Sequence, residues 1–193
     1  VKLSHYNGRD PFCDPFCGSG TIAIEAALIA KNRAPGLNRS FAAQHWSMLD
    51  KKIWLDAADE AMDNEFRDKT YEIWGGDLDP HAVEIARHNA ELAEVDDTVR
   101  FEVDDAMRFH WGGQYGRIVT NPPYGERLLE QKEAEELYRA FGRALEKLPE
   151  TWRIYVLSSH TEFERCFGRS ADKKRKLYNG MLKCDLFMYG KRV

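Results

Sequence analysis

Short apolar runs alternate along this chain with segments of helical periodicity, a pattern typical of an α/β domain built on a largely parallel sheet. Strands are predicted at residues 12–16, 71–76, 99–103, 117–120, 152–157 and 182–188. Most apolar positions of the last run alternate with polar ones, which suits a half-exposed strand lying antiparallel at the end of the sheet.

Helical segments lie between these runs. Helices are predicted at residues 19–31, 50–68, 80–94 and 134–148. The first is apolar enough on all sides to be well buried, whereas the others carry a single apolar stripe. Asp79 followed by Pro80 marks the start of the third helix, and Ser159 with Glu162 predicts a capping box for a further short helix. Residues 33–47 show no period and are expected to form a loop.

The composition bounds the class of protein. With 193 residues and 43% hydrophobic residues, the chain suits one globular domain, residues 1–193, with a real core. It has no apolar run of membrane-spanning length and no signal peptide, so we expect no membrane association. The four cysteines form no C-x-x-C pair and the six histidines are scattered, which favours reduced thiols in the cytoplasm and no metal site.

The net charge of −4 is unusual for a protein that binds nucleic acid by itself. The chain also begins without Met, and its first predicted strand follows within about a dozen residues. We therefore expect this chain to be a fragment whose N-terminal portion is absent, and a basic module in that portion would reconcile the acidic balance with binding to nucleic acid.

A glycine-containing turn, D-P-F-C-G-S-G-T at residues 14–21, joins the first strand to the first helix. Gly18-x-Gly20-x-x-Ala23 formally satisfies the dinucleotide fingerprint, which also expects an acid about 20 residues later to bind the ribose. No acid occurs there, and the next acid at a strand end is Asp77. This arrangement favours S-adenosylmethionine, which has no pyrophosphate but has an ammonium group and a ribose for carboxylates to bind.

Each part of that cofactor has a candidate partner at a strand end, where ligands of open α/β sheets bind. Asp77 is expected to accept the ribose hydroxyls, Gly18 and Gly20 to allow close backbone approach, and Asp105 with Ala106 to receive the adenine amino group. The full set expected at the cofactor is Asp14, Pro15, Cys17, Gly18, Gly20, Thr21, Asp77, Leu78, Asp105, Ala106 and Asn121.

Asn121-Pro122-Pro123-Tyr124 follows the fourth predicted strand and carries the candidate catalytic residues. The prolines fix φ and push Pro122 towards an extended conformation, so its carbonyl and the Asn121 side-chain oxygen become two fixed acceptors for an exocyclic amine. Tyr124 offers a face on which a heterocycle can stack. Alone, the tetrapeptide also suits a proline turn that ends a strand. The upstream cofactor motifs favour the catalytic interpretation.

Together, D-P-F-C-G-S-G-T, G-G-D-L-D-P, D-D-A and N-P-P-Y-G-E-R resemble the motifs of class I S-adenosylmethionine-dependent methyltransferases that act on amines. Residues 34–41 (A-P-G-L-N-R-S-F) and 173–180 (K-K-R-K-L-Y-N-G) are similar to segments of the THUMP-associated guanine-N2 methyltransferases of 23S ribosomal RNA. Members of that family are often labelled N6-adenine-specific DNA methylases, because N-P-P-Y does not discriminate among amines. The resemblance covers nearly the whole chain.

The resemblance implies a Rossmann-like, mostly parallel sheet of seven strands, with an antiparallel C-terminal strand and helices on both faces. It implies methyl transfer from S-adenosylmethionine to guanine N2 of ribosomal RNA, with S-adenosylhomocysteine as product and no metal. It also implies an N-terminal THUMP module that this chain lacks. An adenine-N6 methyltransferase acting on DNA or RNA, and a non-catalytic RNA-binding subunit with this fold, stay open as alternatives, as does the oligomeric state.

The charge run Lys173–Lys176 has two interpretations of similar weight. Most such runs are solvated surface. Here Arg165 and Arg169 precede the run and Tyr178 follows it, which favours an edge that contacts phosphates.

Overall fold

The computed structural model describes residues 1–125 and 128–190, and in this part of the chain one sheet has the strand order β3-β2-β1-β4-β5-β7-β6. The strands are β1 (Phe12–Asp14), β2 (Ile73–Asp77), β3 (Val99–Val103), β4 (Arg117–Thr120), β5 (Arg153–Ser158), β6 (Lys173–Asn179) and β7 (Leu182–Tyr189). The helices are α1 (Thr21–Lys31), α2 (Lys51–Asp63), α3 (Pro80–Leu92), α4 (Leu128–Leu145) and α5 (Phe163–Phe167). Short 3-10 turns are η1 (Lys2–Ser4), η2 (Ala42–His45) and η3 (Ala106–Arg108).

The first five strands along the chain are parallel to one another, and β7 pairs antiparallel with both β5 and β6. This confirms the predicted α/β class and the mostly parallel sheet of seven strands with an antiparallel C-terminal strand. The chain runs outward from β1 to β3 and then returns to the other side of β1 with β4. Such a reversal of strand order is where open α/β sheets bind their ligands.

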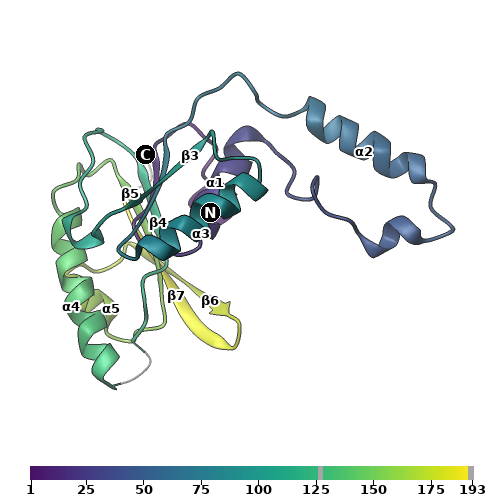
Figure 1. Cartoon of the computed structure of the whole chain (residues 1–193). Coiled ribbons are helices and arrows are strands. Elements are labelled where there is room, and N and C mark those ends of the chain that lie inside the picture. The colour runs from purple at the N-terminus through teal and green to yellow at the C-terminus, as the bar shows by residue number, and fades with distance from the viewer. Residues whose placement is uncertain (126–127, 191–193) are drawn as a thin grey trace.

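Helices cover both faces of the sheet, as predicted. Figure 1 shows α1 and α3 on one face and α4 and α5 on the other. Because successive strand residues point to opposite faces, Phe12 of β1 packs in the core beneath α1 and α3, while its neighbour Cys13 packs in the core beneath α4 and α5. The helical stripe predicted at residues 134–148 supplies Tyr138 and Phe141, both fully buried.

Strand β6 was missed at the sequence level, because its first four residues are Lys, Lys, Arg and Lys. Pairing with β7, which places Leu177 opposite Cys184, holds this charged segment in the sheet. The Lys173–Lys176 side chains are exposed along the sheet edge. Lysines on an edge strand also discourage pairing with another sheet.

The predicted capping box of Ser159 and Glu162 is wrong. Helix α5 begins at Phe163, and Glu162 holds the N-cap position without a side-chain capping bond. The Glu162 amide instead donates to Nδ1 of His160, 3.2 Å away. The turn before α5 is therefore organised by His160, which the pattern did not single out.

The segment between α1 and β2 projects from the rest of the molecule (Figure 1). We call residues 34–69 the arm. Its central helix α2 begins after Asp50, whose side chain accepts from the Lys52 amide, and ends at Asp63, five residues before the predicted end at residue 68. No residue of α2 is buried. The predicted amphipathic helix thus forms, but its apolar stripe is not part of the core.

None of the helices in the described residues is both long enough and apolar enough to cross a bilayer.

Candidate active site

The predicted site residues lie at one edge of the sheet, where β1, β2, β3 and β4 end. The turn after β1 is built by backbone bonds, in which the Cys17 amide donates to the Gly76 carbonyl and the Gly20 amide to the Cys17 carbonyl. Gly18 and Gly20 have φ angles of 51° and 84°, in the left-handed region that favours glycine. A Cβ on Gly20 would lie 2.8 Å from Phe101, whereas one on Gly18 would meet nothing within 4 Å. Gly20 therefore allows helix packing, and Gly18 faces open space.

Asp77, at the end of β2, holds the glycine turn in place. Its Oδ2 accepts from the Gly18 amide at 2.9 Å, and its Oδ1 accepts from the Asp79 amide at 3.0 Å. A carboxylate oxygen has two lone pairs, so both oxygens keep acceptor capacity for a ligand. Leu78 beside it is 67% exposed, an apolar side chain open to a ligand at this edge.

Asp14, at the end of β1, is a buried acid, 1% exposed. Its Oδ1 accepts from the Thr120 hydroxyl at 2.6 Å and from the Phe16 amide at 3.3 Å. Its Oδ2 is buried and has no hydrogen-bond partner among the described residues. Burial raises the pKa of Asp14 to about 7, against the lowering effect of the Thr120 bond. A cation placed against Oδ2 would satisfy this oxygen and restore its charge.

The third strand end brings Asp105 to the same edge, because the preceding Asp104 amide donates to the Asp77 carbonyl. Asp105 caps η3 by accepting from the Met107 amide at 2.9 Å, and Ala106 is buried beneath it. A hollow of about 760 Å³ lies between η3 and α4 and is bordered by Pro123, but neither Asp77 nor Asp105 lines it.

Three further residues predicted to bind the cofactor lie in the turn or at the start of α1. Pro15 is fully buried, and Thr21 is exposed as the first residue of α1. Cys17 is buried, and burial raises the pKa of its thiol, so that it is neutral and contributes volume rather than a nucleophile.

The N-P-P-Y segment leaves β4 directly after Thr120. The Tyr124 hydroxyl donates to Oδ1 of Asn121, the side-chain acceptor predicted to hold an amine. Burial raises the pKa of Tyr124 to about 12, so its hydroxyl stays a donor at neutral pH. The Cys184 thiol of β7 lies 3.8 Å from the same hydroxyl. Glu126 and Arg127, which end the longer motif, lie outside the described residues.

Residues for which the sequence predicted no role at the site support this segment. The Tyr138 hydroxyl, on α4, donates to the Pro123 carbonyl at 2.6 Å and lies 3.4 Å from the Ser158 hydroxyl. The His160 amide donates to that Ser158 hydroxyl at 3.1 Å. Helical periodicity marks Tyr138 only as a core residue. A tyrosine in an otherwise apolar stripe was the available signal, because a buried hydroxyl needs a partner.

The residues at this edge fit S-adenosylmethionine in chemical type. Asp14 Oδ2 is an orphaned acceptor suited to an ammonium group, Asp77 has acceptor capacity suited to a ribose, and Gly18 leaves open space before the turn. Among the described residues, no cluster of three or more His, Cys, Asp or Glu side chains could hold a metal ion.

Sheet order, glycine turn and N-P-P-Y segment define the class I methyltransferase fold. Residues 1–187 match the family model described as "RMKL-like, methyltransferase domain", and the chain belongs to this family. It is 45% identical over all 193 residues to the "Putative RNA methyltransferase YpsC" of Bacillus subtilis, of which it spans 50%. It is 41% identical over 180 residues, 91% of its length, to the "Ribosomal RNA large subunit methyltransferase K/L" of Shewanella baltica (strain OS185), of which the match covers 25%.

Solved structures agree with this family. A "possible methylase" from Clostridium difficile 630 superimposes with a TM-score of 0.93 at 47% identity, covering 96% of this chain and 49% of that one. SMU.472, "a putative methyltransferase complexed with SAH", gives a TM-score of 0.94 at 44% identity, covering 100% of this chain and 51% of that one. The chain thus spans between a quarter and about half of the length of these four relatives.

Proposed function

We propose that this chain transfers a methyl group from S-adenosylmethionine to an exocyclic amine of a nucleic-acid base, guanine N2 of ribosomal RNA. The observation that carries this is the Thr120–Asp14 hydrogen bond, which ties the candidate cofactor acid to the strand that presents Asn121. The names of the relatives support an RNA substrate and, through the SAH complex of SMU.472, the cofactor.

The chain's own residues would hold the cofactor from three strand ends. Asp14 would pair with the ammonium group, Asp77 with the ribose, and Asp105 with the adenine amino group. When bound, S-adenosylmethionine supplies a methyl group that its positive sulfur already activates. The protein therefore needs to align an amine rather than to provide a strong base.

The N-P-P-Y segment would provide that alignment. In the structure the Tyr124 hydroxyl donates to Asn121 Oδ1, and an entering amine would take its place with one of its own N–H groups. The second N–H would bond to the Pro122 carbonyl, while Tyr138 occupies the Pro123 carbonyl and fixes the segment. Two fixed acceptors also stabilise the positive charge that grows on the attacked nitrogen. Tyr124, once released, would stack on the base, which must leave its helix to enter the site.

The identity of the amine is the finer part of the proposal. A relative from Listeria monocytogenes, 44% identical with a TM-score of 0.92, is named a "predicted N6-adenine-specific DNA methylase", so adenine N6 is the competing substrate. The same acceptors suit both amines, since each offers two N–H donors. We place the protein in the cytoplasm, because its four cysteines are all free. Ribosomal RNA is a substrate present in that compartment.

Mass spectrometry of nucleosides tests the proposal directly. Ribosomal RNA and genomic DNA lacking the modification are treated with the full-length protein and cofactor carrying a labelled methyl group. Labelled N2-methylguanosine in RNA is the expected product. Labelled N6-methyladenine in either nucleic acid would replace guanine with adenine. No label in any nucleoside, with cofactor bound, would favour a non-catalytic subunit.

A further inference from the structure

The hairpin of β6 and β7 gathers basic residues in a chain that is acidic as a whole. Residues 173–183 hold five basic residues and no acidic one, whereas the whole chain has a net charge of −4. Gly180 and Met181 connect the two strands, so the basic residues of both strands share one narrow element. A local excess of positive charge of this kind marks a surface for an anionic partner.

The hairpin extends beyond the carboxyl edge of the sheet. Strand β5 ends at Ser158, which is paired with Asp185 of β7. Strand β7 begins before that pair, at Leu182, and residues 182–184 are paired with β6. Figure 1 shows the hairpin projecting on the side of the sheet from which β4 leads into α4. Its tip therefore stands beside the strand ends that carry the candidate active site.

One face of the hairpin contacts the N-P-P-Y segment. The Cys184 thiol lies 3.8 Å from the Tyr124 hydroxyl. Burial raises the pKa of Tyr124 to about 12, and a hydrogen bond with the Asn179 side chain acts against that rise. Cys184 is paired with Leu177, and Asn179 is two residues beyond Leu177, so all three share this face. The face is therefore a wall of the site in which the substrate base is proposed to stack.

The opposite face of the hairpin, which we call the outward face, carries Lys176, Tyr178 and Lys183. Lys176 and Tyr178 are two residues apart in β6, and Tyr178 is paired with Lys183, so their side chains point to the same side. All three are exposed, Tyr178 by 74%. The Tyr178 ring contacts no other ring and no cation within the described part of the chain. An open ring beside two cations suits a single-stranded nucleic acid, whose bases stack and whose phosphates pair with lysines.

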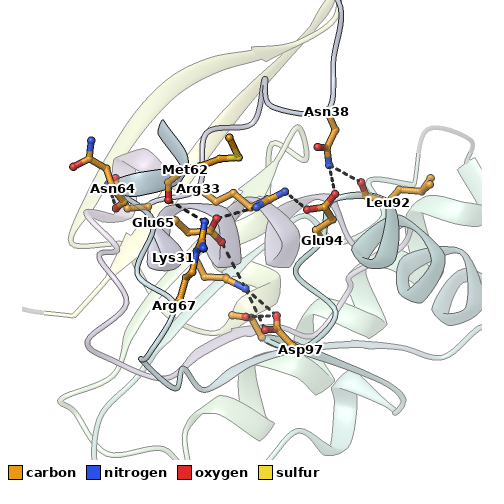
Figure 2. Close-up of polar contacts among 12 residues, drawn as sticks. Lys31, Arg33, Asn38, Met62, Asn64, Glu65, Arg67, Leu92, Glu94 and Asp97 are labelled. Atoms are coloured by element: carbon orange, nitrogen blue, oxygen red, sulfur yellow. Dashed lines mark hydrogen bonds and ion pairs between the residues drawn. The ribbon is translucent and has the colours of Figure 1, made fainter. Parts of the chain in front are cut away.

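Basic side chains elsewhere in the fold are neutralised by acids. Figure 2 shows this at the root of the arm, where Lys31 lies 3.1 Å from Asp97 and Arg33 lies 2.9 Å from Glu65. The side chains of Lys31 and Arg33 are only 12% and 11% exposed. Such paired and largely covered cations hold the fold together and offer little charge to a ligand.

The lysines of the outward face have no such acid. Lys174, which shares this face, lies 2.7 Å from Glu164 and is thereby neutralised. Lys176 and Lys183 form no ion pair among the residues that the structure describes, although Asp185 is paired with Lys176 in the sheet. Their charges are therefore available to phosphates near the tip of the hairpin.

Protection of the sheet edge explains the lysines but not the tyrosine. Strand β6 is the edge of the sheet, where lysines discourage pairing with another strand. Tyrosine favours strand pairing, so an exposed Tyr178 works against that protection. Its place beside Lys176 and Lys183 is instead the one that a base-stacking surface requires.

We propose that the outward face of the β6–β7 hairpin binds the RNA strand next to the base that enters the site. Lys176 and Lys183 pair with its phosphates, and a neighbouring unpaired base stacks on Tyr178. Tyr178 directly precedes Asn179 on the site wall, and consecutive Cα atoms are about 3.8 Å apart, so the two faces are close enough for adjacent nucleotides. This inference rests on the proposed function, because it assumes a nucleic-acid strand at Tyr124.

Removal of the two charges tests the phosphate contacts. Lys176→Gln with Lys183→Gln is compared with Lys51→Gln with Lys147→Gln, which removes the same charge from exposed lysines in α2 and just beyond α4. The affinity of residues 1–193 for a fluorescein-labelled single-stranded RNA is measured by anisotropy over a range of salt concentrations. Each lost contact should reduce the slope of log affinity against log salt by about 0.7, so the hairpin variant should lose about 1.4 and the control nothing.

Tyr178→Ala tests the stacking contact. The RNA affinity should fall roughly 5- to 150-fold, the loss expected for one stacked base, with the salt slope unchanged. Tyr178→Phe keeps the ring and should bind RNA as the wild type does. Thermal unfolding verifies that all variants stay folded.

Kinetics of methyl transfer to ribosomal RNA separate this surface from the chemistry of the site. A contact made equally before and during the reaction changes KM and leaves kcat unchanged. The hairpin variant and Tyr178→Ala should therefore raise KM by the factor by which they lower RNA affinity, with kcat and the affinity for S-adenosylhomocysteine unaltered.

Unchanged RNA affinity and salt slope in the hairpin variant would overturn the proposal and leave the lysines as protection of the sheet edge. An equal loss of slope in the control would overturn it too, because net charge would then set the affinity. So would a wild type without measurable RNA binding, or a fall in kcat at constant KM. The proposed function fails separately, if the wild type labels no guanine N2 in RNA. RNA affinities and salt slopes need no methyl transfer and still decide the role of the hairpin.

Discussion

The carboxyl edge of the sheet and the arm differ in whether their side chains find partners within the chain. At the sheet edge, polar groups are bonded to one another across strands, as in the bonds from Gly18 to Asp77 and from Thr120 to Asp14. In the arm, α2 buries no residue and exposes its apolar face. Helix α1 connects the two regions, and its 11 residues span about 16 Å.

This difference distinguishes two kinds of surface on which some groups have no partner within the described part of the chain. The sheet edge lacks partners only at particular atoms, such as Asp14 Oδ2, which indicates a small polar ligand. In the arm, Trp54 of α2 stacks on Phe41, but Ile53 and Leu55 of the same helix stay exposed. An exposed apolar surface of this kind indicates contact with another macromolecule. Substitutions at the edge should therefore alter chemistry or ligand affinity, and substitutions in the arm should alter association.

The largest effect is expected for Asn121→Ala. This change removes one of the two proposed acceptors for the amine and leaves the glycine turn intact. The rate of methyl transfer should fall on the order of 10²–10³-fold, as for loss of one preorganised polar contact to a developing charge. Single-turnover transfer of labelled methyl to RNA measures it, beside a titration with S-adenosylhomocysteine.

Both halves of that result matter. If Asn121→Ala transferred methyl groups at the wild-type rate, the N-P-P-Y segment would be only a proline turn. An equal loss of cofactor affinity would make Asn121 a cofactor ligand and leave the amine without an assigned acceptor.

Asp77→Ala should weaken cofactor binding next most strongly. The change removes the proposed ribose acceptor and the partner of the Gly18 amide. Losing a charged hydrogen-bonding partner costs on the order of 1.5–3 kcal/mol, or roughly 10- to 150-fold in affinity. Calorimetry with S-adenosylhomocysteine measures the change, and Asp79→Asn, which keeps the cap of α3, is the matched control. Unchanged affinity would move the ribose contact elsewhere.

The sheet edge was largely predictable because its signals are local. Gly18 and Gly20 permit left-handed backbone angles and Pro122 fixes φ, each through its own covalent structure, so their positions between strands and helices already indicated a ligand site. Tyr138 was not predictable as a supporting residue, because its bond to Pro123 depends on how α4 packs against β4. Strand β6 was missed because its pairing with β7 outweighs its charge run.

For the arm, periodicity predicted the helix but not its surroundings. The stripe of Leu55, Ala58 and Met62 indicates which face is apolar, and it is equally compatible with burial in the core and with exposure. The difference depends on whether another part of the chain covers that face, which no local pattern contains.

A third prediction concerns the pH dependence of cofactor binding. The pKa of Asp14 is raised to about 7 by burial, so the free protein binds a proton there below pH 7. An ammonium group against Asp14 favours the ionised acid, so binding releases that proton and strengthens as pH rises through 7. Between pH 8 and pH 6 the affinity for S-adenosylhomocysteine should fall roughly tenfold.

Calorimetry at several pH values, in buffers of different ionisation enthalpy, measures both the affinity and the proton released. Asp14→Asn should bind weakly with a flat profile over this range. A wild-type profile that is equally flat would show that the ammonium group does not contact Asp14.

A smaller effect is expected for Tyr138→Phe, which removes only the hydroxyl that bonds to the Pro123 carbonyl. One neutral hydrogen bond contributes about 0.5–1.5 kcal/mol, so kcat should fall roughly 2- to 10-fold with cofactor affinity unchanged. Steady-state kinetics with RNA separates kcat from KM, and thermal unfolding serves as the control for general destabilisation. A loss confined to thermal stability, with kcat unchanged, would make Tyr138 a core residue only.

The smallest effect on chemistry is expected for Leu55→Asp in the arm. Leu55 is 65% exposed, so the substitution leaves no cavity and buries no charge in the single chain, and surface changes of this kind alter stability by about 0.5 kcal/mol or less. Its position beyond the far end of α1 keeps it from the strand ends that carry the candidate site. Methyl transfer to RNA, measured as the single-turnover rate at saturating protein, should therefore stay within about twofold of wild type. A transfer rate reduced as much as that of Asn121→Ala would mean that the arm takes part in the reaction. The division between chemistry at the sheet edge and association at the arm would then fail.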